Sequence, residues 1–312
     1  MSCPNRLAGL RGSMVALVTP FQNGHIDEAA FVALCERQIS SGTSALVPCG
    51  TTGEAPTLSH AEQSRLIDLA VRTADGRVPV IAGAGSNCTA TTIRMVVEAE
   101  RLGADAVLCI VPYYNRPTQE GLFRHFEAVQ AGTSLPVLLY DVPSRTGTAL
   151  ALDTIVALSR LPNIAGLKDA SGDLSRAARL RYLVAPEFLR LCGDDGLVDA
   201  YLALGCQGCI SVTANVAPAL CAEMHCAWGS HDRPRFEQIS ALLADINGAL
   251  FIESNPIPVK WALARLGLIG GELRLPLTTL EQRHEAKVLF AVQSVVAAEK
   301  QVLTSPSFAA VA

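Results

Sequence analysis

The chain has 312 residues, of which 50% are hydrophobic and 17% are charged, and its formal net charge is −4. This apolar composition excludes a disordered chain, and a pI of about 5.9 argues against a nucleic-acid binder. No run approaches the roughly 18 uninterrupted apolar residues that span a bilayer, and residues 1–6 lack the apolar core of a signal peptide. We therefore expect a soluble globular protein.

Short apolar runs alternate along the chain with longer amphipathic segments. The apolar runs predict eight strands, over Met14–Val18, Ala45–Val47, Val78–Ala82, Ala106–Val111, Val137–Tyr140, Ile164–Leu167, Phe188–Leu191 and Cys209–Val212. The first four amphipathic segments predict helices over Glu28–Ile39, Ala61–Thr73, Thr91–Leu102 and Glu120–Ala131. Asp27 is placed to cap the first helix, and Ser59 with Glu62 forms a capping box for the second.

Continuously apolar strands that alternate with helices are typical of a parallel sheet covered by helices, and eight of them predict an α/β fold, the (β/α)8 TIM barrel. The rival architecture is a doubly wound sheet. Its Gly-x-Gly-x-x-Gly motif is missing after the first strand, and Gly83-Ala84-Gly85 after the third is a poor substitute. We predict a barrel over residues 1–229, a C-terminal helical extension over 230–303 and a flexible tail over 304–312.

Polar residues follow several predicted strands at their C-terminal ends, where the chemistry of such barrels is located. Lys168 comes directly after the apolar run Ile164–Leu167, so its amino group is expected in the mouth of the barrel. Burial disfavours the charged form of a lysine, and a neutral amine can attack a ketone to form a Schiff base that acts as an electron sink. The alternative is a salt bridge to Asp169 or Asp194.

The other strand ends supply residues suited to the same chemistry. Tyr140 ends the neighbouring strand, and a phenol in a dry pocket can carry the protons that Schiff-base formation moves. Thr51 and Thr52 can offer hydroxyl and N–H groups to a carboxylate, and Arg145 can bind one through two parallel hydrogen bonds. Taken singly, each residue also has a purely structural interpretation. Tyr140 fits a strand-end tyrosine with a solvated hydroxyl, Thr51 and Thr52 fit ordinary turn residues, and Arg145 fits a surface charge. Their convergence with Lys168 favours the chemical interpretation.

The ten cysteines mostly lie in apolar runs, which predicts free, packed thiols in a reducing, cytoplasmic compartment. Cys206 and Cys209 form a Cys-x-x-Cys, and Cys221, His225 and Cys226 follow, a set of residue types that zinc sites use. Cys209 opens a strand-like run, and the spacing of Cys221 and Cys226 splits them across a helix. We therefore favour packing over a metal site.

Six segments resemble the dihydrodipicolinate synthase family of the pyruvate-dependent, Schiff-base class I aldolases. The resemblance covers about Gly12 to Leu277 and rests on Gly50–Glu54, Pro112–Pro117, Val142–Gly147, Gly166–Asp169, Ser211–Asn215 and Asn255–Lys260. The second and third segments are more similar to the synthases than to sialic-acid lyases or sugar-acid aldolases. The resemblance implies a lyase that condenses pyruvate with L-aspartate 4-semialdehyde to 4-hydroxy-tetrahydrodipicolinate, the first committed step of lysine and diaminopimelate biosynthesis.

The resemblance also implies residue roles. Lys168 would form the Schiff base with pyruvate, and Tyr140 would donate and accept protons. Thr51 and Tyr114 would complete a proton relay, with Tyr114 reaching in from a neighbouring subunit of a homotetramer built as a dimer of dimers. No metal or organic cofactor is implied, because the lysine is itself the electron sink. The residues assigned to substrate binding are Thr52, Arg145, the backbone at Ile210, and Gly193.

Two departures from the family pattern stand out. Asp141 occupies a position where many relatives have Asn, and its side chain is expected to point away from the chemistry. The second departure is at the feedback site, where some bacterial and plant relatives bind lysine at a dimer interface. Lysine-sensitive members often have Glu at the position of Thr91 and His at that of Gln63. Without that carboxylate an inhibitor ammonium loses a charge-assisted hydrogen bond worth roughly 1.5–3 kcal/mol, which predicts weak or absent lysine inhibition. The matching positions are Ala55, Pro56, His60, Gln63, Asn87, Thr91 and Tyr113.

Three other functions compete with the synthase. A related aldolase acting on a sugar acid or hydroxy-oxo acid would keep the Schiff base, but Arg145 favours a small carboxylated aldehyde over a polyol. A non-catalytic barrel that senses pyruvate or an amino acid would not need Lys168, Tyr140, Thr51 and Tyr114 together. A phosphate-binding barrel is disfavoured because the seventh and eighth loops lack a Gly-rich nest that leads into a helix.

Overall fold

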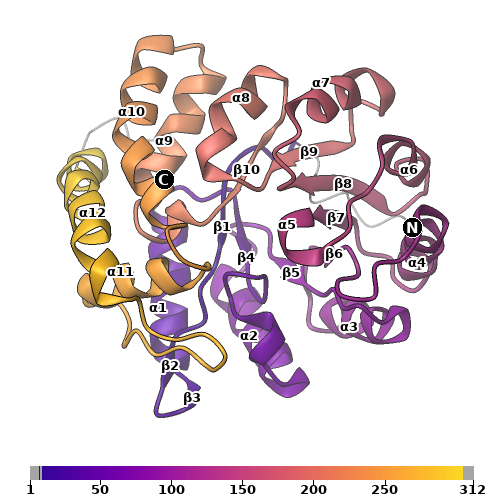
Figure 1. Ribbon diagram of the computed structural model, residues 1–312, viewed down its shortest axis with the longest axis horizontal. Helices are drawn as coiled ribbons and strands as arrows, with labels where there is room; N and C mark the ends of the chain where they lie inside the picture. The colour runs from indigo at the N-terminus through magenta and orange to yellow at the C-terminus, as the bar shows by residue number, and fades with distance from the viewer. Residues whose placement is uncertain (1–6, 8, 305–312) are drawn as a thin grey trace. The chain divides into compact units, whose positions relative to one another are not determined.

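The computed structural model describes residue 7 and residues 9–304 (Figure 1). Eight parallel strands form one sheet in the order β4-β1-β10-β9-β8-β7-β6-β5, in which the first strand stands between the second and the eighth. Together with the helices between the strands, this order confirms the predicted (β/α)8 barrel. The strands are β1 Gly12–Ala16, β4 Ala45–Val47, β5 Ile81–Gly83, β6 Ala106–Ile110, β7 Val137–Asp141, β8 Ile164–Asp169, β9 Leu189–Cys192 and β10 Gly208–Ser211.

The helices follow the strands in chain order, and the four predicted from periodicity lie within two residues of their expected bounds. Through the barrel they are α1 Glu28–Ser40, α2 His60–Ala74, α3 Thr89–Arg101, α4 Gln119–Ala131, α5 Pro143–Thr146, α6 Leu152–Leu158, α7 Leu174–Leu183, α8 Val198–Ala203 and α9 Pro218–Gly229. Three more helices follow, α10 Arg233–Ala249, α11 Ile257–Arg265 and α12 Gln282–Leu303. Within the described residues no helix has the length and apolar character needed to cross a membrane.

The predicted helix caps are confirmed. The Asp27 side chain accepts a hydrogen bond from the backbone N–H of Ala30 at 3.0 Å, which satisfies one of the free donors at the start of α1. At the start of α2, the Ser59 hydroxyl accepts from Glu62 N, and the Glu62 carboxylate accepts from Ser59 N. This reciprocal arrangement is the capping box that the sequence predicts.

A small hairpin lies between β1 and α1, where the sequence analysis predicted no structure. Its strands β2 Phe21–Gln22 and β3 His25–Ile26 pair in antiparallel fashion. The turn between them consists of Asn23 and Gly24, with φ angles of 54° and 80°. Asn-Gly is a strong signal for a two-residue hairpin turn, because both positions need a positive φ.

The chain divides into two compact units. The first contains the described part of Met1–Arg11 together with Pro79–Ile210, and so includes β5 to β9 and most of β10. In it, α3, α4, α6 and α7 lie along the outer side of strands β6 to β8 (Figure 1). The second contains Gly12–Val78 and the described part of Ser211–Ala312, with β1, β4 and α9 to α12.

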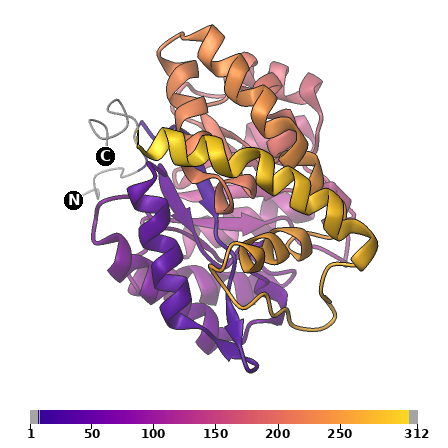
Figure 2. The ribbon, with the colours of Figure 1, turned by 90° about the vertical axis from the view of Figure 1, so that its left-hand side faces the viewer.

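Helix α12 packs against α9, α10 and α11 within the second unit (Figure 2). The Glu299 carboxylate of α12 accepts hydrogen bonds from the N–H groups of Ala219 and Leu220, at 2.8 and 2.9 Å. An anion at a helix N-terminus is favoured by the free donors there, so Glu299 fixes the last helix to the first turn of α9. The boundary at residue 229 stays a prediction. Helix α12 ends at Leu303 with Thr304 as its C-cap, and the rest of the predicted tail lies outside the described residues.

Candidate active site

The pairing of β7 with β8 places two of the predicted catalytic residues opposite each other. In the parallel register Tyr140 is the partner of Lys168, and Asp141 is the partner of Asp169. Successive side chains of a strand point to opposite faces of the sheet, so Tyr140 and Lys168 share one face while the two aspartates share the other. Lys168, predicted at the end of the sixth strand, is the second-to-last residue of β8.

Lys168 and Tyr140 are both buried, each with 6% of its surface exposed. The Lys168 Nζ lies 4.3 Å from the centroid of the Tyr140 ring, within the range of a cation–π contact. Gly193, in the loop after β9, leaves room for the lysine, since a Cβ at this position would stand 3.0 Å from Lys168 Cε. The amino group of a lysine is thus held beside a phenol in a confined site, the combination that a Schiff-base mechanism needs.

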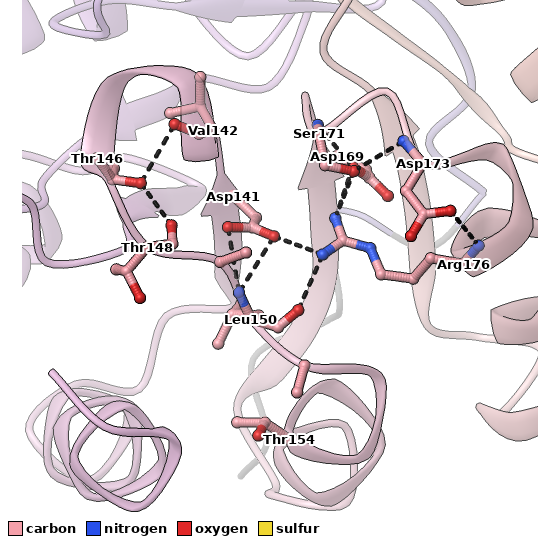
Figure 3. A network of polar contacts seen from close by, with 12 residues as sticks. Asp141, Val142, Thr146, Thr148, Leu150, Thr154, Asp169, Ser171, Asp173 and Arg176 are labelled. Atoms are coloured by element: carbon pink, nitrogen blue, oxygen red, sulfur yellow. Dashed lines mark hydrogen bonds and ion pairs between the residues drawn. The ribbon is translucent and has the colours of Figure 1, made fainter. Parts of the chain in front are cut away.

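The two aspartates on the opposite face are bound by one arginine, Arg176 of α7 (Figure 3). Its Nη1 lies 2.6 Å from Asp141 Oδ2, and its Nη2 lies 2.7 Å from Asp169 Oδ1. Burial raises the pKa of Asp141, and the nearby Arg176 guanidinium opposes that effect. Within the described residues, the structure shows no salt bridge between Lys168 and either alternative partner, Asp169 or Asp194, and Asp169 pairs with Arg176 instead. Asp141 points away from Tyr140, as expected.

Arg145 and Tyr114 lie on two segments of the first unit that are joined by hydrogen bonds. Arg145 is an exposed residue of the short helix α5. Tyr114 N donates to Thr146 O at 3.4 Å, and Arg116 Nε donates to Gly147 O at 3.0 Å. The Tyr114 side chain is 89% exposed, on a backbone with a φ of 72°, which is uncommon for a residue other than glycine.

The segment Gly50–Glu54 belongs to the second unit, where the C-terminal extension supports it. Asn255 Nδ2 donates to the buried Thr52 Oγ1 at 2.9 Å, while Thr51 is partly exposed. Lys260 of α11 is fully buried and pairs with Glu54 at 2.6 Å, and it also donates to Thr19 O at 2.8 Å. Burial lowers the pKa of Lys260, and the Glu54 carboxylate opposes that shift. Ile210, the remaining predicted substrate contact, is buried in β10.

The seven residues assigned to the feedback site divide between the two units. In the second, Gln63 Nε2 donates to Ala55 O at 3.0 Å, and Pro56 and His60 are exposed. In the first, Asn115 Nδ2 donates to Asn87 O at 2.9 Å, and Tyr113 is half-buried. Arg94 Nη2 donates to Thr91 Oγ1 at 3.0 Å, which places a guanidinium beside Thr91.

The cysteines of the described chain are free, and most of them are buried. Burial raises the pKa of the Cys35, Cys49 and Cys109 thiols to about 12, so they stay protonated and behave as small apolar side chains. Among the residues that the structure describes, no three His, Cys, Asp or Glu side chains are grouped to hold a metal ion.

Arg176, Asn255 and Lys260 were not assigned roles from the sequence, although each binds a residue of the predicted site or its immediate neighbour. Asn255 and Lys260 belong to a segment singled out only for its resemblance. The sequence did carry one signal for Arg176. It falls three residues after the helix cap Asp173, on the face of α7 that buries Ala177 and Leu180, and a buried arginine needs an anionic partner.

The fold is a (β/α)8 barrel, and its strand ends place a buried lysine beside a tyrosine. This combination is typical of barrel enzymes in which a lysine acts as the nucleophile. A model of the dihydrodipicolinate synthetase family matches residues 9–295. A 4-hydroxy-tetrahydrodipicolinate synthase of Hyphomonas neptunium is 52% identical over 279 residues, which are 89% of this chain and 95% of that protein. The chain belongs to the dihydrodipicolinate synthetase family, and it is a lyase.

Solved structures of the family share the fold. The 4-hydroxy-tetrahydrodipicolinate synthase of Methylacidiphilum fumariolicum has a TM-score of 0.91 at 41% identity, and the match covers 94% of this chain and 99% of that one. The chloride-inhibited dihydrodipicolinate synthase of Acinetobacter baumannii, solved in complex with pyruvate, has a TM-score of 0.89 at 42% identity, covering 91% and 98%.

The Lys260–Glu54 ion pair leads to a stability prediction. Lys260→Met leaves the Glu54 carboxylate buried without its main partner, and we expect the free energy of unfolding to fall by about 3–5 kcal/mol in urea titrations. The double variant Glu54→Gln/Lys260→Met removes both charges and should recover at least half of the loss. The exposed Lys287→Met on α12 serves as the control and should stay within about 0.5 kcal/mol. A single Lys260→Met variant as stable as this control would contradict the prediction.

Proposed function

We propose that the protein condenses pyruvate with L-aspartate 4-semialdehyde, through a Schiff base on Lys168, to give 4-hydroxy-tetrahydrodipicolinate. The observation that supports this most directly is the register of β7 with β8, which sets a buried Lys168 beside a buried Tyr140. Family membership supports the choice of reaction, since the relatives carry the name of this synthase. The sugar-acid alternative has no comparable support.

In the proposed reaction the neutral amine of Lys168 attacks the ketone carbon of pyruvate. The resulting carbinolamine loses its hydroxyl as water, and Tyr140 supplies the proton that this departure needs. Loss of a methyl proton from the imine gives an enamine, whose carbon attacks the aldehyde of the second substrate. The amine of that substrate then attacks the imine carbon, which closes the ring and releases Lys168. Thr51 and Tyr114 are proposed to relay protons to and from Tyr140.

Separate groups are proposed to hold the two substrate carboxylates. Thr52, through its hydroxyl, and the backbone at Ile210 would bind the carboxylate of pyruvate. Gly193 would contribute its small size, which leaves space for the lysine stem and the adduct. Arg145 would bind the carboxylate of the aldehyde, because a guanidinium can form two parallel hydrogen bonds with it. Since the imine is the electron sink, the proposed reaction uses no metal or organic cofactor.

Trapping of the imine tests the chemistry. Borohydride reduction in the presence of pyruvate is expected to leave a stable adduct on Lys168, located by mass spectrometry of peptides. The Lys168→Arg variant should form no adduct, because a guanidinium stays protonated and is not a nucleophile. Lys287→Arg is a matched control on an exposed lysine. An adduct on another lysine, or none, would refute the mechanism.

Turnover with the aldehyde completes this test by separating the two aldolase functions. Rapid consumption of aspartate semialdehyde in a coupled assay supports the synthase. Trapping of pyruvate on Lys168 without turnover of this aldehyde would instead support the related aldolase for sugar acids or hydroxy-oxo acids.

We also propose that the enzyme works as a homotetramer in the cytoplasm, where its free thiols would persist. The strained, 89% exposed Tyr114 supports the oligomer, because its proposed relay role requires a neighbour to cover it. We expect a tetramer in sedimentation velocity. Tyr114→Phe, which removes only the hydroxyl, should lower turnover without changing the oligomer. A fully active monomer would argue against the proposal.

Inhibition by lysine is expected to be weak or absent. Thr91 offers no carboxylate to the ammonium group of lysine, and the bound Arg94 guanidinium repels it. Thr91→Glu should lower the half-inhibitory concentration about tenfold or more, since a charge-assisted hydrogen bond is worth roughly 1.5–3 kcal/mol. Thr91→Gln, of the same size but uncharged, is the matched control. Millimolar or tighter inhibition of the unmodified enzyme in steady-state assays would contradict the prediction.

A further inference from the structure

We propose that Arg176 is a positioning residue, which holds Tyr140, Lys168 and the segment that carries Arg145 in their reactive arrangement. The proposal rests on the function proposed above. Arg176 binds the face of the sheet that carries Asp141 and Asp169 (Figure 3). Lys168 lies on the other face, because side chains alternate along β8, so the effect of Arg176 would pass through the backbone of β7 and β8.

The guanidinium joins the ends of the two strands that carry the catalytic pair. Asp141 follows Tyr140, Asp169 follows Lys168, and the two aspartates are register partners. The Nη1 of Arg176 bonds Asp141 at 2.6 Å and its Nη2 bonds Asp169 at 2.7 Å, so one planar group spans both strands. A sliding of β7 against β8, which would separate Tyr140 from Lys168, would break one of these bonds.

The same guanidinium also fixes the segment that follows α5. Arg176 Nη1 donates to Leu150 O at 2.9 Å, and Asp141 accepts from Leu150 N at 3.3 Å. Both backbone groups of Leu150 are therefore held by the ion pair. Inside the segment, the Thr146 hydroxyl donates to Thr148 O at 2.7 Å. Arg145 thus lies on a short stretch that is anchored at one end by the end of β7 and at the other by Leu150.

Burial makes this arrangement specific. The side chains are 7% exposed for Arg176, 0% for Asp141 and 5% for Asp169. An alternative register would leave a carboxylate buried without its partner, and such a charge is strongly unfavourable. Only arginine offers two separate amino groups on a rigid plane, whereas a lysine is a single point charge that can bond one of the two carboxylates well.

The remaining contacts orient Arg176 itself. The Asp173 carboxylate caps α7 and accepts from Arg176 N at 2.9 Å, which fixes the backbone of the arginine. Ser171 Oγ accepts from Nη2 at 2.9 Å and also donates to Asp169 at 2.6 Å. Arg176 is therefore held at its backbone and at both terminal amino groups of the guanidinium, as a positioning role requires.

The test compares Arg176→Gln, Arg176→Lys and the exposed Arg179→Gln of the same helix. Each is assayed at a temperature where near-ultraviolet circular dichroism shows it to be folded. The rate of borohydride-trapped adduct formation on Lys168 should fall tenfold to about a hundredfold in Arg176→Gln, because small misplacements of reacting groups have effects of this size. The KM for the aldehyde should rise, because the Arg145 segment loses its anchor.

Arg176→Lys separates positioning from stability. We expect it to recover most of the urea midpoint lost in Arg176→Gln, while its trapping rate stays at least fivefold below that of the unmodified enzyme. Arg179→Gln should match the unmodified enzyme in both measurements. Equal trapping rates for all folded variants, or full recovery of the rate in Arg176→Lys, would overturn the proposal. An unmodified enzyme that forms no adduct would instead refute the proposed function.

Discussion

The parallel register of β7 with β8 is the constraint on which the candidate site depends. It pairs Tyr140 with Lys168, and it pairs the residue after each of them, Asp141 with Asp169. Because side chains alternate along a strand, this single register sets the catalytic pair on one face and the two carboxylates on the other. A shift of one residue would exchange the faces, so chemistry and packing are specified together.

Two buried ion-pair clusters hold segments of the candidate site in position. Arg176 binds two strand-end aspartates, and Lys260 binds Glu54, the last residue of the Gly50–Glu54 segment. Removing ions from water costs free energy that their attraction offsets only when the geometry is good, so such pairs are weak evidence for stability. Through these pairs, helix α7 holds the ends of β7 and β8, and helix α11 holds the Gly50–Glu54 segment.

The proposed chemistry needs few charged groups. Recognition of two anionic substrates is assigned to Thr52, Arg145 and backbone groups, and covalent catalysis to one lysine. The small number of charged residues in the proposed site agrees with a chain in which only 17% of residues are charged and the net charge is −4. The overall charge balance therefore carries no information about the substrates, whereas the strand ends do.

Much of the fold follows from local rules that act on neighbouring residues. Apolar runs predicted all eight strands, and Asp27 and Ser59 predicted two helix starts, because periodicity and capping depend on residues a few positions apart. The fold class in turn placed Lys168 and Tyr140 among the strand ends. The roles of the site residues, and the boundary at residue 229, stay predictions.

The tertiary structure alone decided what those residues contact. Arg176 binds Asp141, which is 35 positions away along the chain, and Lys260 binds Glu54, which is 206 positions away. No periodic pattern encodes such pairings, since they arise only when the strands have taken their register and the helices have packed against them. The sequence by itself thus determined the eight barrel strands and the first four helices, and it placed Tyr140 and Lys168 near strand ends. Packing decided the partner of each buried charge, because ion pairs form between groups that are adjacent in the folded chain, whatever their separation in the sequence.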